Sequence, residues 1–142
     1  MILTITINPL LEQRLTFSNL NSDKKNRNGK LNIAAGGKGI NVSRQLNKLS
    51  VQNIALTFSG GTFGKLFRES VRIEGLNISF IHTKSETRIC SVIIHSDECK
   101  AQYYFGENSK ITKDETDKFI MQMEKMIQNC ELVIFSGSSP CK

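Results

Sequence analysis

The chain has 142 residues, of which 39% are hydrophobic. This length is enough for one packed core and too short for two ordinary domains, so we expect one α/β domain or part of one. Together, 19 Lys and Arg and 13 Asp and Glu give a formal net charge of +6. That charge is compatible with an anionic ligand, a nucleic acid or a solvated basic surface.

The N-terminal run Ile2–Ile7 is rich in Ile and Thr, which is typical of a β-strand. Pro9 ends the run because proline cannot donate to a strand ladder. No basic segment precedes this run, and it is too short to cross a membrane. The sequence therefore predicts neither a signal peptide nor a membrane span, and we expect a cytoplasmic protein.

Residues 51–82 have the pattern of a βαβ unit. A β-rich run from Val51 to Phe58 ends at two glycines, apolar residues then recur at helical spacing up to Gly75, and Ile78–His82 is a second β-rich run. The strands of such a unit are parallel, and parallel sheets carry helices on both faces. The sequence therefore predicts an α/β fold with a mostly parallel sheet.

The last third of the chain has the pattern of a helix followed by a strand. Thr112 and Glu115 form a capping box before a segment with one apolar face. Leu132–Phe135 is typical of a short buried strand, and a turn follows at residues 136–140. Open α/β sheets bind ligands at this carboxyl edge, so the turn is a candidate part of a binding site.

Residues 15–33 and 88–105 do not fit the alternation of strands and helices. In the second region, two β-rich runs flank a polar turn, which predicts a β-hairpin outside the main sheet. The first region contains the densest basic stretch, residues 24–30, which has no aromatic residue to stack on bases. We expect a solvated loop there and no nucleic-acid partner.

The cysteines and histidines do not form a metal-binding pattern. Cys90, Cys99, Cys130 and Cys141 include no CxxC pair, and neither histidine lies at zinc-finger spacing around them. We therefore expect free thiols and no metal site.

Residues 35–44 read AGGKGINVSR, in which glycines lead into a segment with helical periodicity. Glycine permits close approach of the backbone, and a helix N-terminus offers N–H donors and partial positive charge to an anion. Lys38 adds a full charge, and the amide of Asn41 can bond to sugar hydroxyls. The spacing fits neither a Walker A loop nor a dinucleotide fingerprint. The alternative is a glycine turn that only lets the helix pack on the sheet.

Five motifs together resemble the phosphofructokinase B (ribokinase-like) family of carbohydrate kinases. They are ITINP at 5–9, GGKGINV at 36–42, FSGGTFG at 58–64, ETR at 86–88 and SGSSP at 136–140. Their order is the family's order, and they extend along the whole chain. The first two look most like the 1-phosphofructokinase and tagatose-6-phosphate kinase branch.

This resemblance implies a Rossmann-like sheet with a small β-sheet lid, made by segments of about 12–34 and 88–106. The lid often serves as the dimer interface in the family, which is compatible with a homodimer here. Residues 1–142 are then expected to be the N-terminal part of a sugar kinase domain, without the C-terminal nucleotide-binding half.

The resemblance also implies roles for individual residues. The expected substrate-binding residues are Glu12, Gly36, Gly37, Lys38, Asn41, Arg88, Ser136 and Gly137. Glu12 and Asn41 are expected to contact sugar hydroxyls, and Arg88 the substrate phosphate, whose oxygens a guanidinium matches in a bidentate way. The alternative for Arg88 is a surface arginine on a hairpin. Two departures from the family are Glu12, where the branch usually carries Asp, and residues 103–108, which replace an Asn-Glu-Pro-Gly-like segment.

By resemblance, a full-length relative transfers a phosphoryl group from ATP, with Mg²⁺, to a phosphosugar. We expect fructose 1-phosphate as the preferred acceptor and tagatose 6-phosphate as the next. The family's Gly-Ala-Gly-Asp turn, which supplies the general base, has no match in the chain and is expected beyond Lys142. We therefore expect no catalytic residue here, and the alternative function is a catalytically inactive phosphosugar-binding or dimerising remnant.

Overall fold

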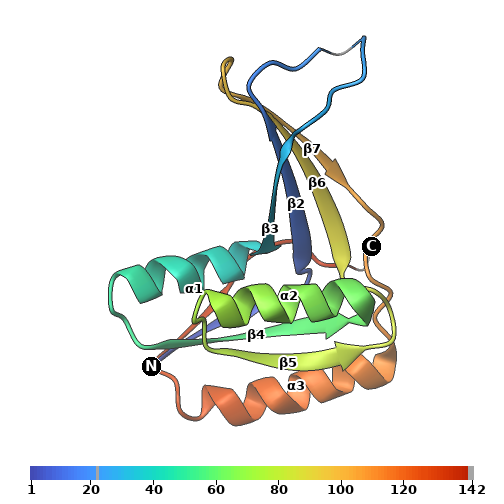
Figure 1. The fold of residues 1–142 in the computed structure, drawn as a ribbon. Coiled ribbons are helices and arrows are strands. Elements are labelled where there is room, and N and C mark those ends of the chain that lie inside the picture. The colour runs from blue at the N-terminus through green and yellow to red at the C-terminus, as the bar shows by residue number, and fades with distance from the viewer. Residues whose placement is uncertain (22, 141–142) are drawn as a thin grey trace.

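In the computed structural model, which describes residues 1–21 and 23–140, the chain forms two four-stranded sheets and three helices (Figure 1). The elements are β1 (Ile2–Thr6), β2 (Leu10–Phe17), β3 (Lys30–Gly36), α1 (Lys38–Lys48), β4 (Asn53–Gly60), α2 (Gly61–Ile73), β5 (Ile78–Thr83), β6 (Arg88–His95), β7 (Lys100–Phe105), α3 (Lys113–Ile127) and β8 (Leu132–Phe135). Sheet A has the strand order β5-β4-β1-β8, and sheet B has the order β3-β2-β6-β7.

Sheet A is parallel throughout. Helices α1 and α2 cover one face and α3 covers the other (Figure 1). Successive side chains of β1 point to opposite faces of sheet A. Leu3 and Ile5 pack with Phe119 of α3 on one face, whereas the hydroxyl of Thr4 lies 2.6 Å from that of Ser43 of α1 on the other. The predicted mostly parallel sheet with helices on both faces is confirmed.

Helix α3 begins with the capping box that the sequence predicts. The Thr112 hydroxyl accepts a hydrogen bond from the Glu115 amide at 3.3 Å, and the Glu115 carboxylate accepts one from the Thr112 amide at 2.8 Å. The same carboxylate accepts a hydrogen bond from the Lys84 amide at 2.7 Å. One turn later, the rings of Phe119 and Phe58 have centroids 4.5 Å apart. These contacts fix α3 against sheet A.

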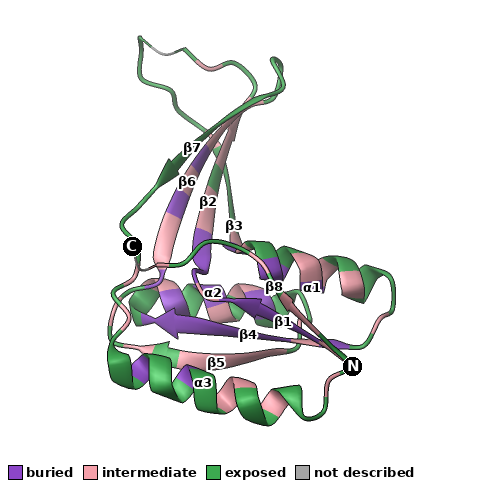
Figure 2. Cartoon of the chain, turned by 180° about the vertical axis from the view of Figure 1, so that it is seen from behind, coloured by how far each residue is buried: buried purple, intermediate pink, exposed green. Residues whose placement is uncertain are grey.

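Sheet B contains both regions that do not fit the alternating pattern. Strands β6 and β7 form the predicted antiparallel hairpin, β2 pairs parallel with β6, and β3 pairs antiparallel with β2. The chain passes from sheet A to sheet B at Asn8-Pro9, directly between β1 and β2. Figure 2 shows buried residues gathered in sheet A and at the base of sheet B, whereas β7 is exposed along its length.

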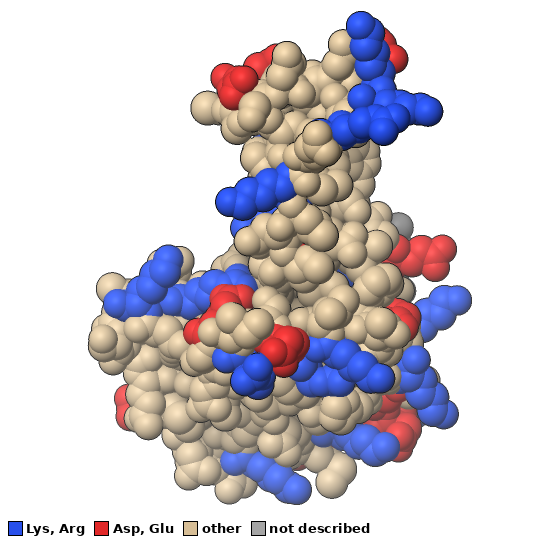
Figure 3. All heavy atoms as spheres, in the orientation of Figure 1, with Lys and Arg blue, Asp and Glu red and all other residues tan. Residues whose placement is uncertain are grey.

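The basic residues on the face shown in Figure 3 are not gathered in one stripe. On the face shown in Figure 3, blue side chains are interspersed with acidic and uncharged ones. The stretch at residues 24–30 lies in the connection between β2 and β3 and reaches the first residue of β3. Neither the scattered basic side chains nor the stretch at residues 24–30 forms an extended basic groove on this face.

The structure also bears on membrane-spanning helices and on the state of the cysteines. No helix in the described part of the chain is long and apolar enough to cross a membrane. Cys90, Cys99 and Cys130 are free thiols, and Cys141 lies outside the described residues.

Candidate functional site

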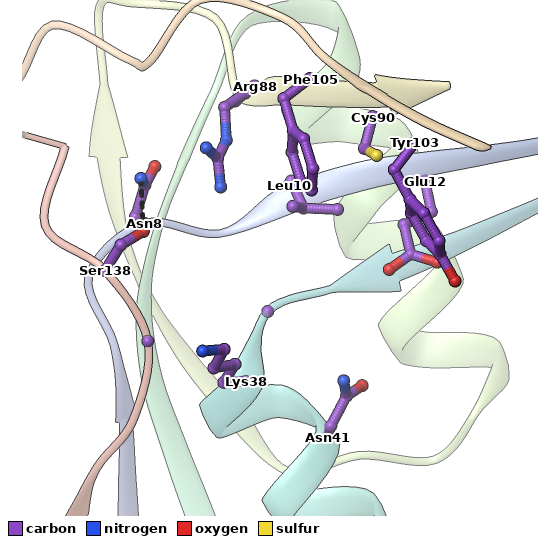
Figure 4. A pocket seen from close by; sticks show the side chains of 12 residues that line it. Asn8, Leu10, Glu12, Lys38, Asn41, Arg88, Cys90, Tyr103, Phe105 and Ser138 are labelled. Atoms are coloured by element: carbon purple, nitrogen blue, oxygen red, sulfur yellow. Dashed lines mark hydrogen bonds between the residues drawn. The ribbon is translucent and has the colours of Figure 1, made fainter. Parts of the chain in front are cut away.

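A pocket of about 370 Å³ lies where sheet B meets the N-terminus of α1 (Figure 4). Its lining residues are Asn8, Leu10, Glu12, Gly37, Lys38, Asn41, Arg88, Cys90, Tyr103, Phe105, Gly137 and Ser138. In Figure 4, the side chains from sheet B lie on one side of the pocket, and Lys38 and Asn41 of α1 lie on the other. The turn after β8 closes a third side, so the pocket lies at the carboxyl edge of sheet A.

The pocket brings together most of the binding residues predicted from the sequence. Those that line it are Glu12, Gly37, Lys38, Asn41, Arg88 and Gly137. Gly36 and Ser136 do not line it but lie beside it. Gly36 pairs with Leu10 in the β2–β3 ladder, and the Ser136 amide donates to the carbonyl of Ile5 at 3.3 Å. The roles of all eight residues in binding stay predictions.

Two glycines allow α1 to begin at the pocket. Gly37 is the N-cap residue, with a φ of 134°, and no side chain caps the first turn. A Cβ on Gly39 would lie 2.7 Å from the carbonyl oxygen of Ile5, so glycine lets α1 start this close to β1. The uncapped N–H groups and the positive end of the helix dipole are therefore at the pocket.

Arg88 is positioned by a loop that is fastened to the start of α2. The Glu86 carboxylate accepts hydrogen bonds from two amides in the first turn of α2, at 2.9 and 3.0 Å. Thr87 is bonded to Gly60 in both directions, through its amide at 2.9 Å and its hydroxyl at 3.0 Å. Arg88 follows directly as the first residue of β6, so its backbone has little freedom to move.

The side chain of Arg88 is partly buried and incompletely bonded. Its Nη1 donates to Oδ1 of Asn108 at 3.0 Å, and its guanidinium lies 5.4 Å from the centroid of the Phe105 ring. Its Nε is buried and has no hydrogen-bond partner in the described part of the chain. Burial lowers the pKa of the guanidinium, which nevertheless stays charged at neutral pH. A buried cation of this kind is stabilised by an anion.

The charges around the pocket favour an anionic ligand. The Glu12 carboxylate, the acidic group in the lining, is paired with Arg14, whose Nε donates to it at 2.7 Å. Neither Lys38 nor Arg88 has a carboxylate partner within residues 1–21 and 23–140. The lining therefore carries two uncompensated cations beside one neutralised carboxylate, which suits a phosphate group next to hydroxyls.

Several pocket residues were not predicted from the sequence. The Asn8 side chain donates at 3.2 Å both to Asn108 Oδ1 and to the Ser138 hydroxyl, and so links the turn after β8 to the partner of Arg88. Cys90 is buried at the base of sheet B, and burial raises the pKa of its thiol, as does the neighbouring Glu12. The sequence had pointed to Asn8 through the Asn-Pro motif and to Ser138 through the turn at residues 136–140, but it had indicated no role for Asn108 or Cys90.

The family model described as "pfkB family carbohydrate kinase" matches residues 5–142. The chain belongs to the pfkB family of carbohydrate kinases. A pfkB family relative, the tagatose-6-phosphate kinase of Staphylococcus epidermidis, is 31% identical over 140 residues, which cover 99% of this chain and 44% of the relative. The chain thus spans less than half the length of this curated relative.

Solved structures agree with the pfkB assignment. A possible 1-phosphofructokinase from Thermotoga maritima is 28% identical and superimposes with a TM-score of 0.90, covering 98% of this chain and 45% of that one. Phosphofructokinase-2 from Escherichia coli, in complex with fructose-6-phosphate, is 21% identical with a TM-score of 0.85, covering 99% of this chain and 46% of that one. At 21% identity, the similarity to the Escherichia coli enzyme concerns the fold alone.

The pfkB family implies ATP and Mg²⁺. Within residues 1–21 and 23–140, no group of three or more His, Cys, Asp and Glu is placed to hold a metal ion.

Proposed function

We propose that the pocket binds a phosphorylated sugar and that the chain is the sugar-binding half of an ATP-dependent sugar-phosphate kinase. The main support is that one pocket of a pfkB family chain combines two uncompensated cations, Lys38 and Arg88, with the hydroxyl-binding groups of Glu12 and Asn41. The names of the relatives, tagatose-6-phosphate kinase and possible 1-phosphofructokinase, suggest the substrate class. We take fructose 1-phosphate as the preferred acceptor and tagatose 6-phosphate as the next.

In this proposal, Arg88 and Lys38 bind the phosphate of the substrate. Asn108 accepts from one N–H group of Arg88 Nη1, so the remaining N–H groups of the guanidinium, including that of the unpartnered Nε, and the Lys38 ammonium are the donors available to the phosphate oxygens. Glu12 accepts hydrogen bonds from sugar hydroxyls, and the amide of Asn41 donates to one. The N–H groups around Gly36 and Gly37, and the turn at Ser136 and Gly137, border the sugar.

Phosphoryl transfer to the sugar hydroxyl also needs a general base and stabilisation of charge on the transferred group. ATP with Mg²⁺ supplies the transferred group in such a kinase. The residues of this chain hold and orient the acceptor, and none of them acts as the base. We propose that the base and the nucleotide site belong to the remaining length that the curated relatives have and this chain does not span.

Sheet B supports the alternative function, a catalytically inactive phosphosugar-binding or dimerising remnant. We propose that sheet B is a lid, with segments of about 12–34 and 88–106, through which two copies of the chain associate. By the strand register, Leu31, Ile33 and Tyr104 lie on the face of sheet B opposite Glu12 and Phe105, and they are 56%, 39% and 57% exposed. An exposed apolar sheet face of this kind favours association.

Thermal unfolding of the purified chain tests the proposal, because a ligand that binds only the folded state raises the unfolding temperature. We expect an increase with millimolar fructose 1-phosphate or tagatose 6-phosphate, and none with Mg-ATP alone. Fructose and inorganic phosphate are the matched controls. No increase with either sugar phosphate would contradict the proposed site, and turnover of fructose 1-phosphate with ATP by this chain would contradict the inactive alternative.

A further inference from the structure

Arg44 of α1 is not among the residues that line the sugar pocket, yet it contacts one of them. Its Nη1 donates to Oδ1 of Asn41 at 2.5 Å. Its Nη2 donates to the carbonyl oxygen of Ala35 in β3. The same guanidinium donates to both carboxylate oxygens of Glu74, from Nη2 to Oε1 at 2.9 Å and from Nε to Oε2. One guanidinium therefore joins α1, β3 and the C-terminal end of α2.

The acceptors around Arg44 are themselves held in place. The Ser70 hydroxyl donates to Glu74 at 3.3 Å and accepts a hydrogen bond from the Ala35 amide at 2.9 Å. Both backbone polar groups of Ala35 are thus bonded to side chains of this network. The side chains of Arg44 and Glu74 are only 20% and 29% exposed, so water competes weakly for their ion pair. The guanidinium consequently has little freedom to rotate.

The chemistry of Arg44 decides the orientation of the Asn41 amide. A guanidinium has five N–H donors and no acceptor, so the Asn41 atom that faces it must be the carbonyl oxygen. The Asn41 Nδ2 then lies on the opposite side of the amide. Asn41 lines the sugar pocket and reaches into it from α1 (Figure 4), so the NH₂ group is available as a donor there.

We propose that Arg44, held by Glu74, is a positioning residue that fixes Asn41 as a hydrogen-bond donor to an acceptor oxygen of the sugar. This inference rests on the proposed function, because it assigns a direction to one hydrogen bond of the sugar site. Without Arg44 the Asn41 amide can rotate, and both amide orientations are populated. A ligand then has to select the productive orientation, which lowers its affinity.

A double-mutant cycle tests this proposal by titration of fructose 1-phosphate into the wild-type chain, Asn41→Ala, Arg44→Met and the double variant. We expect each single substitution to weaken binding by about threefold to tenfold, as for one neutral hydrogen bond. In the Asn41→Ala background, Arg44→Met should weaken binding no further. Arg44→Lys should not restore affinity, because an ammonium cannot bridge the three acceptors. Arg72→Met is the matched control, since Arg72 pairs with Glu69 on the exposed side of α2 and should leave binding unchanged.

A second measurement makes the inference independent of sugar binding. In the ligand-free wild-type chain, we expect the Asn41 side-chain NH₂ group to give one well-dispersed pair of NMR resonances, and we expect Arg44→Met and Glu74→Gln to broaden or average that pair. Unchanged resonances in both variants, or additive losses of affinity in the cycle, would overturn the positioning role. If the Asn41 signals respond as expected while the wild-type chain binds no sugar phosphate, the proposed function fails and the positioning of the amide stands.

Discussion

Nη1 of Arg88 donates a hydrogen bond to Oδ1 of Asn108 at 3.0 Å, across the end of the β6–β7 hairpin. The same oxygen accepts a hydrogen bond from the Asn8 side chain at 3.2 Å. Asn108 therefore connects the candidate phosphate ligand on sheet B to the carboxyl edge of sheet A. It lies in the segment where the sequence departs from the family, so no role was predicted for it.

Replacing Asn108 with Ala should weaken sugar-phosphate binding by about threefold to tenfold, because Arg88 loses the acceptor that orients its fork. Binding of unphosphorylated fructose should change little, because Asn108 orients Arg88, and Arg88 binds the phosphate group that fructose lacks. Isothermal titration of both sugars into the variant checks this. Asn129→Ala, an exposed position after α3, is the control. Equal losses for both sugars would show that Asn108 acts on the pocket as a whole.

Two glycines of the same motif should respond differently to alanine. A Cβ on Gly36 would lie closest to Cδ1 of Leu10 and 2.9 Å from Oε1 of Glu12, both side-chain atoms that can move. A Cβ on Gly39 would lie 2.7 Å from the backbone oxygen of Ile5, which cannot move without displacing β1. We therefore expect Gly36→Ala to shift Glu12 and reduce sugar affinity with little loss of stability. Gly39→Ala should lower the free energy of unfolding by about 1–3 kcal/mol.

Urea unfolding and sugar titration of the two glycine variants separate these effects. The outcome that would contradict this reading is the reverse pattern, in which Gly36→Ala unfolds the chain and Gly39→Ala leaves its stability unchanged.

The stability of the chain should depend on Glu115 at acidic pH. Burial alone raises the pKa of this carboxyl, but hydrogen bonds from the Thr112 and Lys84 amides outweigh it, so the folded pKa lies below the usual value. The stability that Glu115 contributes is therefore complete above its unfolded pKa of about 4.3, and is lost as the pH falls through the folded value.

Glu115→Gln should destabilise the chain at neutral pH by about 1–3 kcal/mol, because an amide has one acceptor oxygen for the two partly buried backbone donors of Lys84 and Thr112. The free energy of unfolding of this variant should also fall less steeply than that of the wild-type chain below a pH of about 4.3. Urea unfolding between neutral and acidic pH measures both effects, with exposed Asp117→Asn as the control. An unchanged pH dependence in Glu115→Gln would contradict the role given to this carboxylate.

Local patterns in the sequence predicted most of sheet A and its helices. Strand β8 runs from Leu132 to Phe135 as expected, and the Thr112 capping box starts α3, because both signals depend on neighbouring residues. The expected burial of β8 was wrong, because β8 is an edge strand of sheet A and its end residues Leu132 and Phe135 are exposed. Strand β2 was harder to recognise. Its residue Glu12 lines the pocket and Arg14 pairs with it, so two charged residues break the apolar alternation that marks an ordinary strand.

The sequence was less informative about how sheet B builds the site. Tyr103 and Phe105 reach the pocket because β7 pairs with β6 in a register that no local pattern encodes. Asn8, Asn108 and Ser138 meet only because segments distant in sequence converge at the edge of sheet A. Arg88 was identified through the family motif, and a surface arginine on a hairpin was left open as the alternative.

In the proposed function, this pocket recognises the phosphate of a sugar phosphate through Arg88. Isothermal titration of fructose 1-phosphate and of fructose, into the wild-type chain and into Arg88→Met, tests it most directly. We predict that the wild-type chain prefers the phosphorylated sugar by on the order of tenfold to a hundredfold, as expected for charged hydrogen bonds, and that this preference collapses in Arg88→Met. A wild-type chain that binds both sugars equally, or a preference that persists without the guanidinium, would contradict the account.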